Sequence, residues 1–137
     1  MSGINHIAVW VAGIAHFVLG AGWYTAFGGA WLAAIGKTEA QVRADQPNAA
    51  IPMAIAVAVA VVIAYTLAWL LPRLGAQSAA GGARTGVTLA LALIATTLAM
   101  NYGFEARSLA LWLINSGYMV VGMALMGAIV GGWRKKS

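Results

Sequence analysis

Charge and cysteine are what this sequence has least of. Only 8% of its 137 residues are charged, while 62% are hydrophobic and the mean hydropathy is +0.84. A soluble domain carries about 25% charged residues, so eight basic and three acidic side chains cannot cover a surface that faces water. This balance excludes a soluble globular domain and a disordered chain, and it predicts a protein that lies in a lipid bilayer.

The missing cysteines and motifs also exclude several kinds of chemistry. Without cysteine there are no disulfides, thiolate metal sites or cysteine nucleophiles. The sequence has no phosphate-binding loop, no HExxH and no GxSxG. We therefore expect neither hydrolysis nor phosphoryl transfer, and we assign no catalytic residue, no metal and no cofactor.

Four long apolar runs provide the predicted membrane-crossing segments. They cover residues 4–26, 51–71, 83–102 and 109–132, and a helix needs about 20 apolar residues to cross the hydrocarbon core. The runs lack the alternation of barrel strands. We predict an all-α polytopic membrane protein, a bundle of four transmembrane helices that forms a single domain over residues 1–137. The first run has no basic start, so we expect a retained helix and not a signal peptide.

The loop after the first run, residues 28–50, has a helical pattern of its own. Trp31 and Leu32 belong to one apolar face of a short helix, as expected for a helix that lies at the membrane interface. Thr38 followed by Gln41 is a capping box that opens a second short helix. We therefore expect two short interfacial helices in this loop.

The distribution of basic residues predicts the orientation. Four spans put both chain ends on one side of the membrane, together with the bases Arg73, Arg84, Arg134, Lys135 and Lys136. The other side holds three bases and all three acids. Because cytoplasmic loops carry the excess of lysine and arginine, we predict that both termini are cytoplasmic. Bases scattered over loops and chain ends do not form a nucleic-acid-binding face, so we expect no nucleic acid as a partner.

Aromatic residues lie near the ends of the predicted spans. Trp23, Tyr24, Trp31 and Trp112 fall near one interface, and Trp69 and Trp133 fall near the other. Amphipathic rings favour the headgroup level of a bilayer, so we interpret these six as an aromatic belt. Packing between helices is the alternative.

His16 is the only ionisable residue near the predicted membrane midplane. Polar groups in hydrocarbon are costly and need partners. Two interpretations stay open. His16 is either a neutral side chain that joins two helices by a hydrogen bond, or a group that handles protons or binds a ligand.

A second polar cluster is predicted where the third run ends and the fourth begins. Asn101 and Glu105 are one helical turn apart, and Arg107 follows two residues later, within expected reach of a carboxylate. Asn115 and Tyr118 share a face of the next helix. The cluster is either a set of polar contacts that only holds the helices together or part of a ligand site. The candidate ligand-binding residues are His16, Asn101, Glu105, Arg107, Asn115 and Tyr118.

Small residues on the fourth run favour close helix packing. Gly127 and Gly131 form a GxxxG pair, which brings helices together either within one chain or between two chains. We predict a homodimer, with this pair as one candidate interface.

Two stretches resemble the signature of a known family. They are residues 101–109 (NYGFEARSL) and 112–118 (WLINSGY), and residues 20–24 (GAGWY) are similar as well. The sequence resembles a family of small bacterial four-helix membrane proteins that is catalogued only as a domain of unknown function. The resemblance implies a four-helix protein of the bacterial inner membrane, and it implies no activity.

Three functions remain open from the sequence. The first is binding or permeation of a small polar or ionic ligand within the helix bundle. The second is an accessory or assembly subunit of a larger membrane complex, without a ligand. The third is a membrane enzyme that acts on a lipid or quinone with His16 as the base. A cavity beside His16 or Asn115 favours the first function, and a fully packed bundle favours the second.

Overall fold

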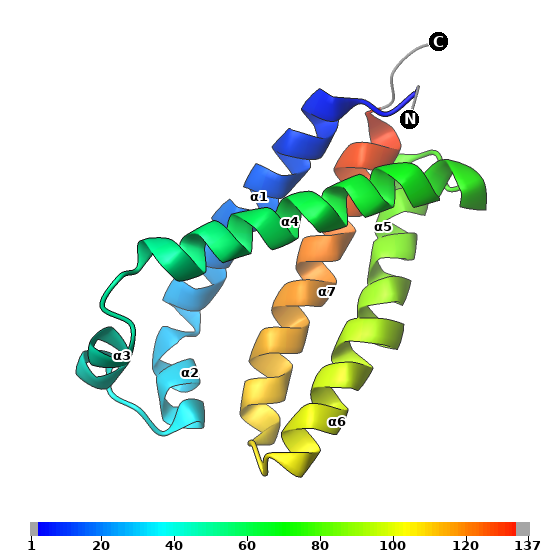
Figure 1. Cartoon of the computed structure of the whole chain (residues 1–137). Helices are drawn as coiled ribbons and strands as arrows, with labels where there is room; N and C mark the ends of the chain where they lie inside the picture. The colour runs from blue at the N-terminus through cyan, green and yellow to red at the C-terminus, as the bar shows by residue number, and fades with distance from the viewer. Residues whose placement is uncertain (1–2, 134–137) are drawn as a thin grey trace.

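Helices account for nearly all of the structure, a computed structural model that describes residues 3–133 (Figure 1). No strand occurs among these residues. Two short helices in the first loop are α2 (Gly28–Ile35) and α3 (Glu39–Asp45). The longer helices are α1 (His6–Ala26), α4 (Ala50–Leu70), α5 (Ala79–Leu89), α6 (Thr96–Phe104) and α7 (Leu109–Gly132). A 3-10 turn, η1 (Leu71–Leu74), continues α4, and a π-helical turn, η2 (Ala90–Ala95), joins α5 to α6.

Four helical segments are long and apolar enough to cross a membrane, which indicates a membrane protein. They are His6–Ala26, Ala50–Leu74, Ala79–Phe104 and Leu109–Gly132. The predicted all-α fold with four such helices and short helices in the first loop is therefore confirmed.

The helix boundaries follow from capping side chains. In the capping box that opens α3, the Thr38 hydroxyl accepts from the Gln41 amide at 3.2 Å, and the Gln41 side chain accepts from the Thr38 amide at 2.8 Å. The third segment begins at Ala79, earlier than predicted, because the Ser78 hydroxyl caps α5 by accepting from the amide of Gly81 at 2.9 Å.

Helix α7 lies at the centre of the fold and contacts each of α1, α4 and α5. Helix α4 lies across α1 and α7 at a steep angle (Figure 1). The largest fully buried side chains are Val9 of α1, Leu67 of α4, Leu71 of η1 and Met126 of α7. The core therefore lies where the second half of α4 meets α1 and α7.

Glycines bring the backbones of α5 and α7 into direct contact. A Cβ atom on Gly82 would overlap the carbonyl oxygen of Gly127, and one on Gly127 would overlap the carbonyl oxygen of Gly82. One turn along, a Cβ on Gly86 would overlap the carbonyl oxygen of Met123. Gly131 likewise faces α5, with the Ser78 carbonyl oxygen 2.6 Å from where its Cβ would lie.

This contact corrects one expectation about assembly. The Gly127–Gly131 pair was a candidate interface between two chains, but both glycines are buried within one chain. The partner is a second GxxxG pair, Gly82 and Gly86, whose first glycine lies between the predicted runs 51–71 and 83–102 and so outside any predicted helix. Small residues on both helices are what allows so close an approach.

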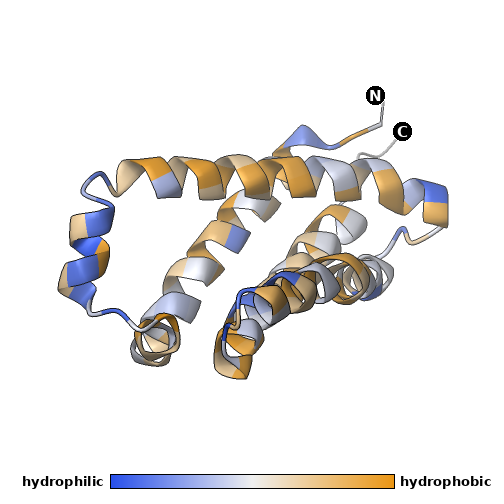
Figure 2. Ribbon diagram, turned by 60° about the horizontal axis from the view of Figure 1, so that its bottom comes forward, coloured by the Kyte–Doolittle hydropathy of each residue, from blue (hydrophilic) through white to orange (hydrophobic). Residues whose placement is uncertain are grey.

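Apolar side chains cover most of the outside of the long helices. Figure 2 shows α4 as predominantly hydrophobic, whereas hydrophilic residues gather in α3. Every residue of α4 from position 51 to 59 is exposed, and so are Trp10, Ile14 and Val18 of α1. An outward-facing apolar surface of this kind is consistent with contact with a lipid bilayer.

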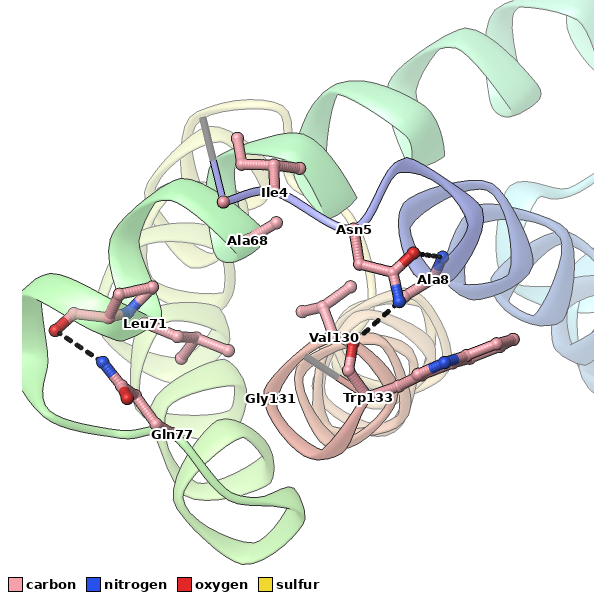
Figure 3. Close-up of a pocket in the computed structure, with 11 residues that line it drawn as sticks. Ile4, Asn5, Ala8, Ala68, Leu71, Gln77, Val130, Gly131 and Trp133 are labelled. Atoms are coloured by element: carbon pink, nitrogen blue, oxygen red, sulfur yellow. Dashed lines mark hydrogen bonds between the residues drawn. The ribbon is translucent and has the colours of Figure 1, made fainter. Parts of the chain in front are cut away.

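The two ends of the described chain meet beside the connection from α4 to α5. The Asn5 side-chain amide donates to the carbonyl oxygen of Trp133 at 3.2 Å. Both residues, with Leu71 and Gln77, line a small cavity of about 30 Å³ (Figure 3). That volume suits a single water molecule. The basic residues Arg134, Lys135 and Lys136 of the orientation argument lie outside the described residues.

The close α5–α7 packing predicts a strong difference between two glycine substitutions. Gly82→Ala should lower the free energy of unfolding by about 1–3 kcal/mol, because the added methyl group overlaps a backbone carbonyl that cannot rotate away. Gly22→Ala is the matched control, since nothing lies within 4 Å of its Cβ position. It should leave the free energy of unfolding unchanged or raise it by up to about 1 kcal/mol, because alanine favours a helix more than glycine does. Thermal unfolding in detergent measures both, and equal effects would contradict the packing.

Candidate functional site

Five of the six candidate residues fall into two separate groups. His16, Asn115 and Tyr118 lie between α1 and α7, whereas Glu105 and Arg107 lie where α6 turns into α7. Asn101 joins neither group: it is exposed, and its side chain makes no hydrogen bond within the described residues.

His16 is a packed aromatic residue between two helices. It is only 4% exposed, and its ring stacks on Tyr118 with centroids 4.6 Å apart and an interplanar angle of 17°. The Tyr118 hydroxyl donates to the backbone carbonyl of His16 at 3.0 Å. Gly122 makes room for the imidazole, because a Cβ there would overlap Nδ1 and Cε1. Nδ1 has no hydrogen-bond partner among the described residues.

Asn115 connects three helices through two tyrosines. Its Oδ1 accepts from the Tyr24 hydroxyl of α1 at 2.7 Å, and its Nδ2 donates to the Tyr102 hydroxyl of α6 at 2.8 Å. The Tyr24 ring also meets the Tyr118 ring edge to face, with centroids 5.4 Å apart. These contacts link Asn115 to the His16–Tyr118 stack through aromatic packing.

Two tryptophans reinforce the same region by donating to backbone carbonyls of neighbouring helices. Trp23 of α1 donates through Nε1 to Ile114 of α7 at 3.0 Å. Trp112 of α7 donates to Ala95, the last residue of the π-helical turn, at 2.8 Å. Both indoles therefore have a packing role in addition to their place near helix ends.

Tyr24 and Tyr102 are the site residues that the sequence analysis missed as candidates. Their hydroxyls complete the hydrogen bonds of Asn115. A signal was present, because a half-buried amide in an apolar helix needs polar partners from other helices, and few side chains near these helix ends supply them.

Glu105 and Arg107 form an exposed ion pair. Arg107 Nε lies 3.1 Å from Glu105 Oε2, with side chains 44% and 52% exposed. Arg107 reaches a carboxylate, as expected, because the left-handed conformation of Ala106, whose φ is 53°, turns the chain between the two residues. A pair this exposed contributes little to stability.

An open groove lies beside Asn115. Its walls come from α1, α2, α3, the start of α4, and α7, and its volume is about 1220 Å³. Asn115 is the only one of the six candidates among the residues that line it, next to Tyr24. The apolar lining comprises Trp31, Leu32, Val42 and Met53, and Glu39 and Arg43 form an ion pair at the α3 wall.

A family comparison agrees with this architecture. The family model described as "Protein of unknown function (DUF1761)" matches residues 7–131. The chain belongs to this family. The resemblance noted in the sequence is thereby confirmed, and the match covers all four long helical segments of this family member almost completely. Searches of curated proteins and of solved structures gave no match.

Asn115 and Asn101 allow a matched test of the hydrogen bonds that join Asn115 to Tyr24 and Tyr102. Asn115→Ala should lower the free energy of unfolding by about 1–2 kcal/mol, because it removes two interhelical hydrogen bonds, each worth about 0.6 kcal/mol on average in membrane proteins. Asn101→Ala should change it by less than about 0.5 kcal/mol, since that side chain bonds no described residue. Thermal unfolding in detergent separates the two. Equal losses would show that the network does not hold the helices together.

Proposed function

We propose that this protein binds a small amphipathic ligand in the groove beside Asn115, in the inner membrane of a bacterium. The observation that carries the proposal is the combination of apolar walls with a polar end in one groove. Trp31, Leu32 and Met53 provide apolar surface, and Tyr24 and Asn115 provide hydrogen-bonding groups. Ligand sites are typically apolar pockets with a few convergent polar groups.

The polar end of the groove keeps capacity for a ligand. An amide side chain has two donor hydrogens and two acceptor lone pairs. Asn115 uses one donor for Tyr102 and one acceptor for Tyr24, so one of each remains. The Tyr24 hydroxyl also keeps its acceptor lone pairs while it donates to Asn115. A ligand headgroup with both a donor and an acceptor matches this pair.

In this proposal the other candidate residues support the groove. The His16–Tyr118 stack holds α1 against α7 and so fixes the distance between Tyr24 and Asn115. Glu105 and Arg107 fix the turn from α6 into α7. Permeation through the bundle centre has less support, because His16 is packed between Tyr118 and Gly122 and does not line the groove.

An accessory or assembly subunit of a larger membrane complex is the second candidate function, and the exposed first half of α4 favours it as a surface for another chain. Residues 51–59 are all exposed and apolar in character except Pro52. A second copy that packs on this face would make a homodimer, and Ala54 and Ala58, one turn apart, are small residues of the kind that lets membrane helices pack closely. The ligand proposal and the dimer are compatible, since the two surfaces meet only at Met53.

Filling the groove tests the ligand proposal. Gly29 lines the groove with nothing within 4 Å of its Cβ position, so Gly29→Trp should place an indole in the ligand space. Gly22→Trp is the control, because Gly22 is equally open but lies outside the groove lining. Native mass spectrometry of protein purified from its own membranes should show a retained small molecule on the wild type and on Gly22→Trp, and none on Gly29→Trp.

Two results would contradict these proposals. Retention of the molecule by Gly29→Trp, or a wild-type protein that carries none, would argue against the groove as a ligand site. The same spectra report the mass of the assembly, and a mass of one chain at all protein concentrations would contradict the homodimer.

The proposed orientation has cytoplasmic termini, supported by the excess of bases at that end. Because the chain has no cysteine, single introduced thiols report their side of the membrane unambiguously. Gln46→Cys, just after α3, should react with a membrane-impermeant maleimide in intact cells, whereas Ser137→Cys should react only after the membrane is permeabilised. The reverse labelling pattern would invert the orientation.

A further inference from the structure

Charge is distributed unequally between the two ends of the molecule. All three acids are paired with bases at the end that holds α3 and the α6–α7 turn: Asp45 with Lys37, Glu39 with Arg43, and Glu105 with Arg107. The opposite end, where the described chain begins and ends, holds Arg73 and has no acidic residue. The three ion pairs carry no net charge, so the excess positive charge of the described residues comes from Arg73 and Arg84.

Arg73 is held in place by two contacts with Trp69. Its Cζ lies 4.2 Å from the centroid of the Trp69 ring, and its Nη1 donates to the carbonyl oxygen of Trp69 at 2.5 Å. A guanidinium has five N–H donors, so this bond leaves four. No carboxylate side chain of the described residues contacts it, because all three are paired elsewhere. The stacked guanidinium is thus held in place with most of its donors available.

The surroundings of Arg73 are those of a membrane interface. Trp69 and Leu74 are 47% and 58% exposed at the end of a segment long and apolar enough to cross a membrane. An exposed tryptophan, an exposed leucine and an arginine at a helix end are typical of a segment whose apolar groups enter the acyl region while the charge reaches the headgroups.

We infer that Trp69 and Arg73 form a binding site for the phosphate of an anionic phospholipid. The planar guanidinium donates two parallel N–H bonds to phosphate oxygens, a geometry that suits arginine better than lysine. The lipid chains then lie along the exposed ring of Trp69 and the side chain of Leu74.

Lipid competition on the purified full chain tests this site. Native mass spectrometry should show phosphatidylglycerol retained in preference to phosphatidylcholine. Arg73→Gln should lower that preference about fivefold, the effect expected of one basic residue near an anionic surface. Arg43→Gln is the matched control, since Arg43 is paired with Glu39 at the other end, and its preference should equal that of the wild type. Arg73→Lys should fall between, because it keeps the charge and loses the bidentate geometry.

Each contrary result has a definite meaning. Equal retention of both lipids by the wild type, or an unchanged preference in Arg73→Gln, overturns the site. Displacement of phosphatidylglycerol by equimolar soluble glycerol 1-phosphate also overturns it, because the site would then bind free phosphate and not a lipid. If Arg73→Gln does not fold, Arg73→Lys decides: a preference equal to that of the wild type contradicts bidentate recognition.

Discussion

The backbone contact between α5 and α7 is the constraint on which the rest of the structure depends. In a bilayer, lipid tails are as apolar as leucine, so helices gain little from hiding apolar side chains and associate through close packing. Gly82 and Gly127 allow that packing, because each faces the other's backbone. Since α7 also contacts α1 and α4, its position against α5 fixes the whole arrangement.

Hydrogen bonding imposes the second constraint, because hydrocarbon offers no partner to a buried polar group. The structure meets it with side chains that reach across helix boundaries: the indoles of Trp23 and Trp112 bond carbonyls of other helices, and Asn115 bonds two tyrosines. These bonds gather at one end of α7, and they leave Asn115 with spare donor and acceptor capacity next to a groove. Under the proposed function, a structural role and a binding role coincide at Asn115.

Much of the fold is predictable from the sequence, because helices that face lipid need long, continuous runs of apolar residues. A continuous apolar run of about 20 residues has few alternatives to a membrane-crossing helix, and the Thr38–Gln41 pair identified the start of α3. The start of α5 was less predictable, since Gly81 and Gly82 have the composition of a loop and form a helix only through the Ser78 cap and the contact with α7. Three-dimensional packing, not local preference, decides such positions.

The candidate site was only partly predictable for a related reason. Proximity in the sequence correctly predicted that Arg107 reaches Glu105, although the contact forms in the turn after α6, through the left-handed Ala106. It could not show that Asn101 is exposed while Asn115 is bonded on both sides, because that difference depends on where Tyr24 and Tyr102 lie on other helices. The groove could not be predicted from the sequence either, since residues from five separate helices form its walls.

The most direct test of the central claim, that this groove is the ligand site, is an experimental structure of the full chain in nanodiscs formed from its native membrane. The proposal predicts non-protein density in the groove, within hydrogen-bond distance of Asn115 and in contact with Trp31. An empty groove, or ligand density beside His16 in the bundle centre, would contradict it.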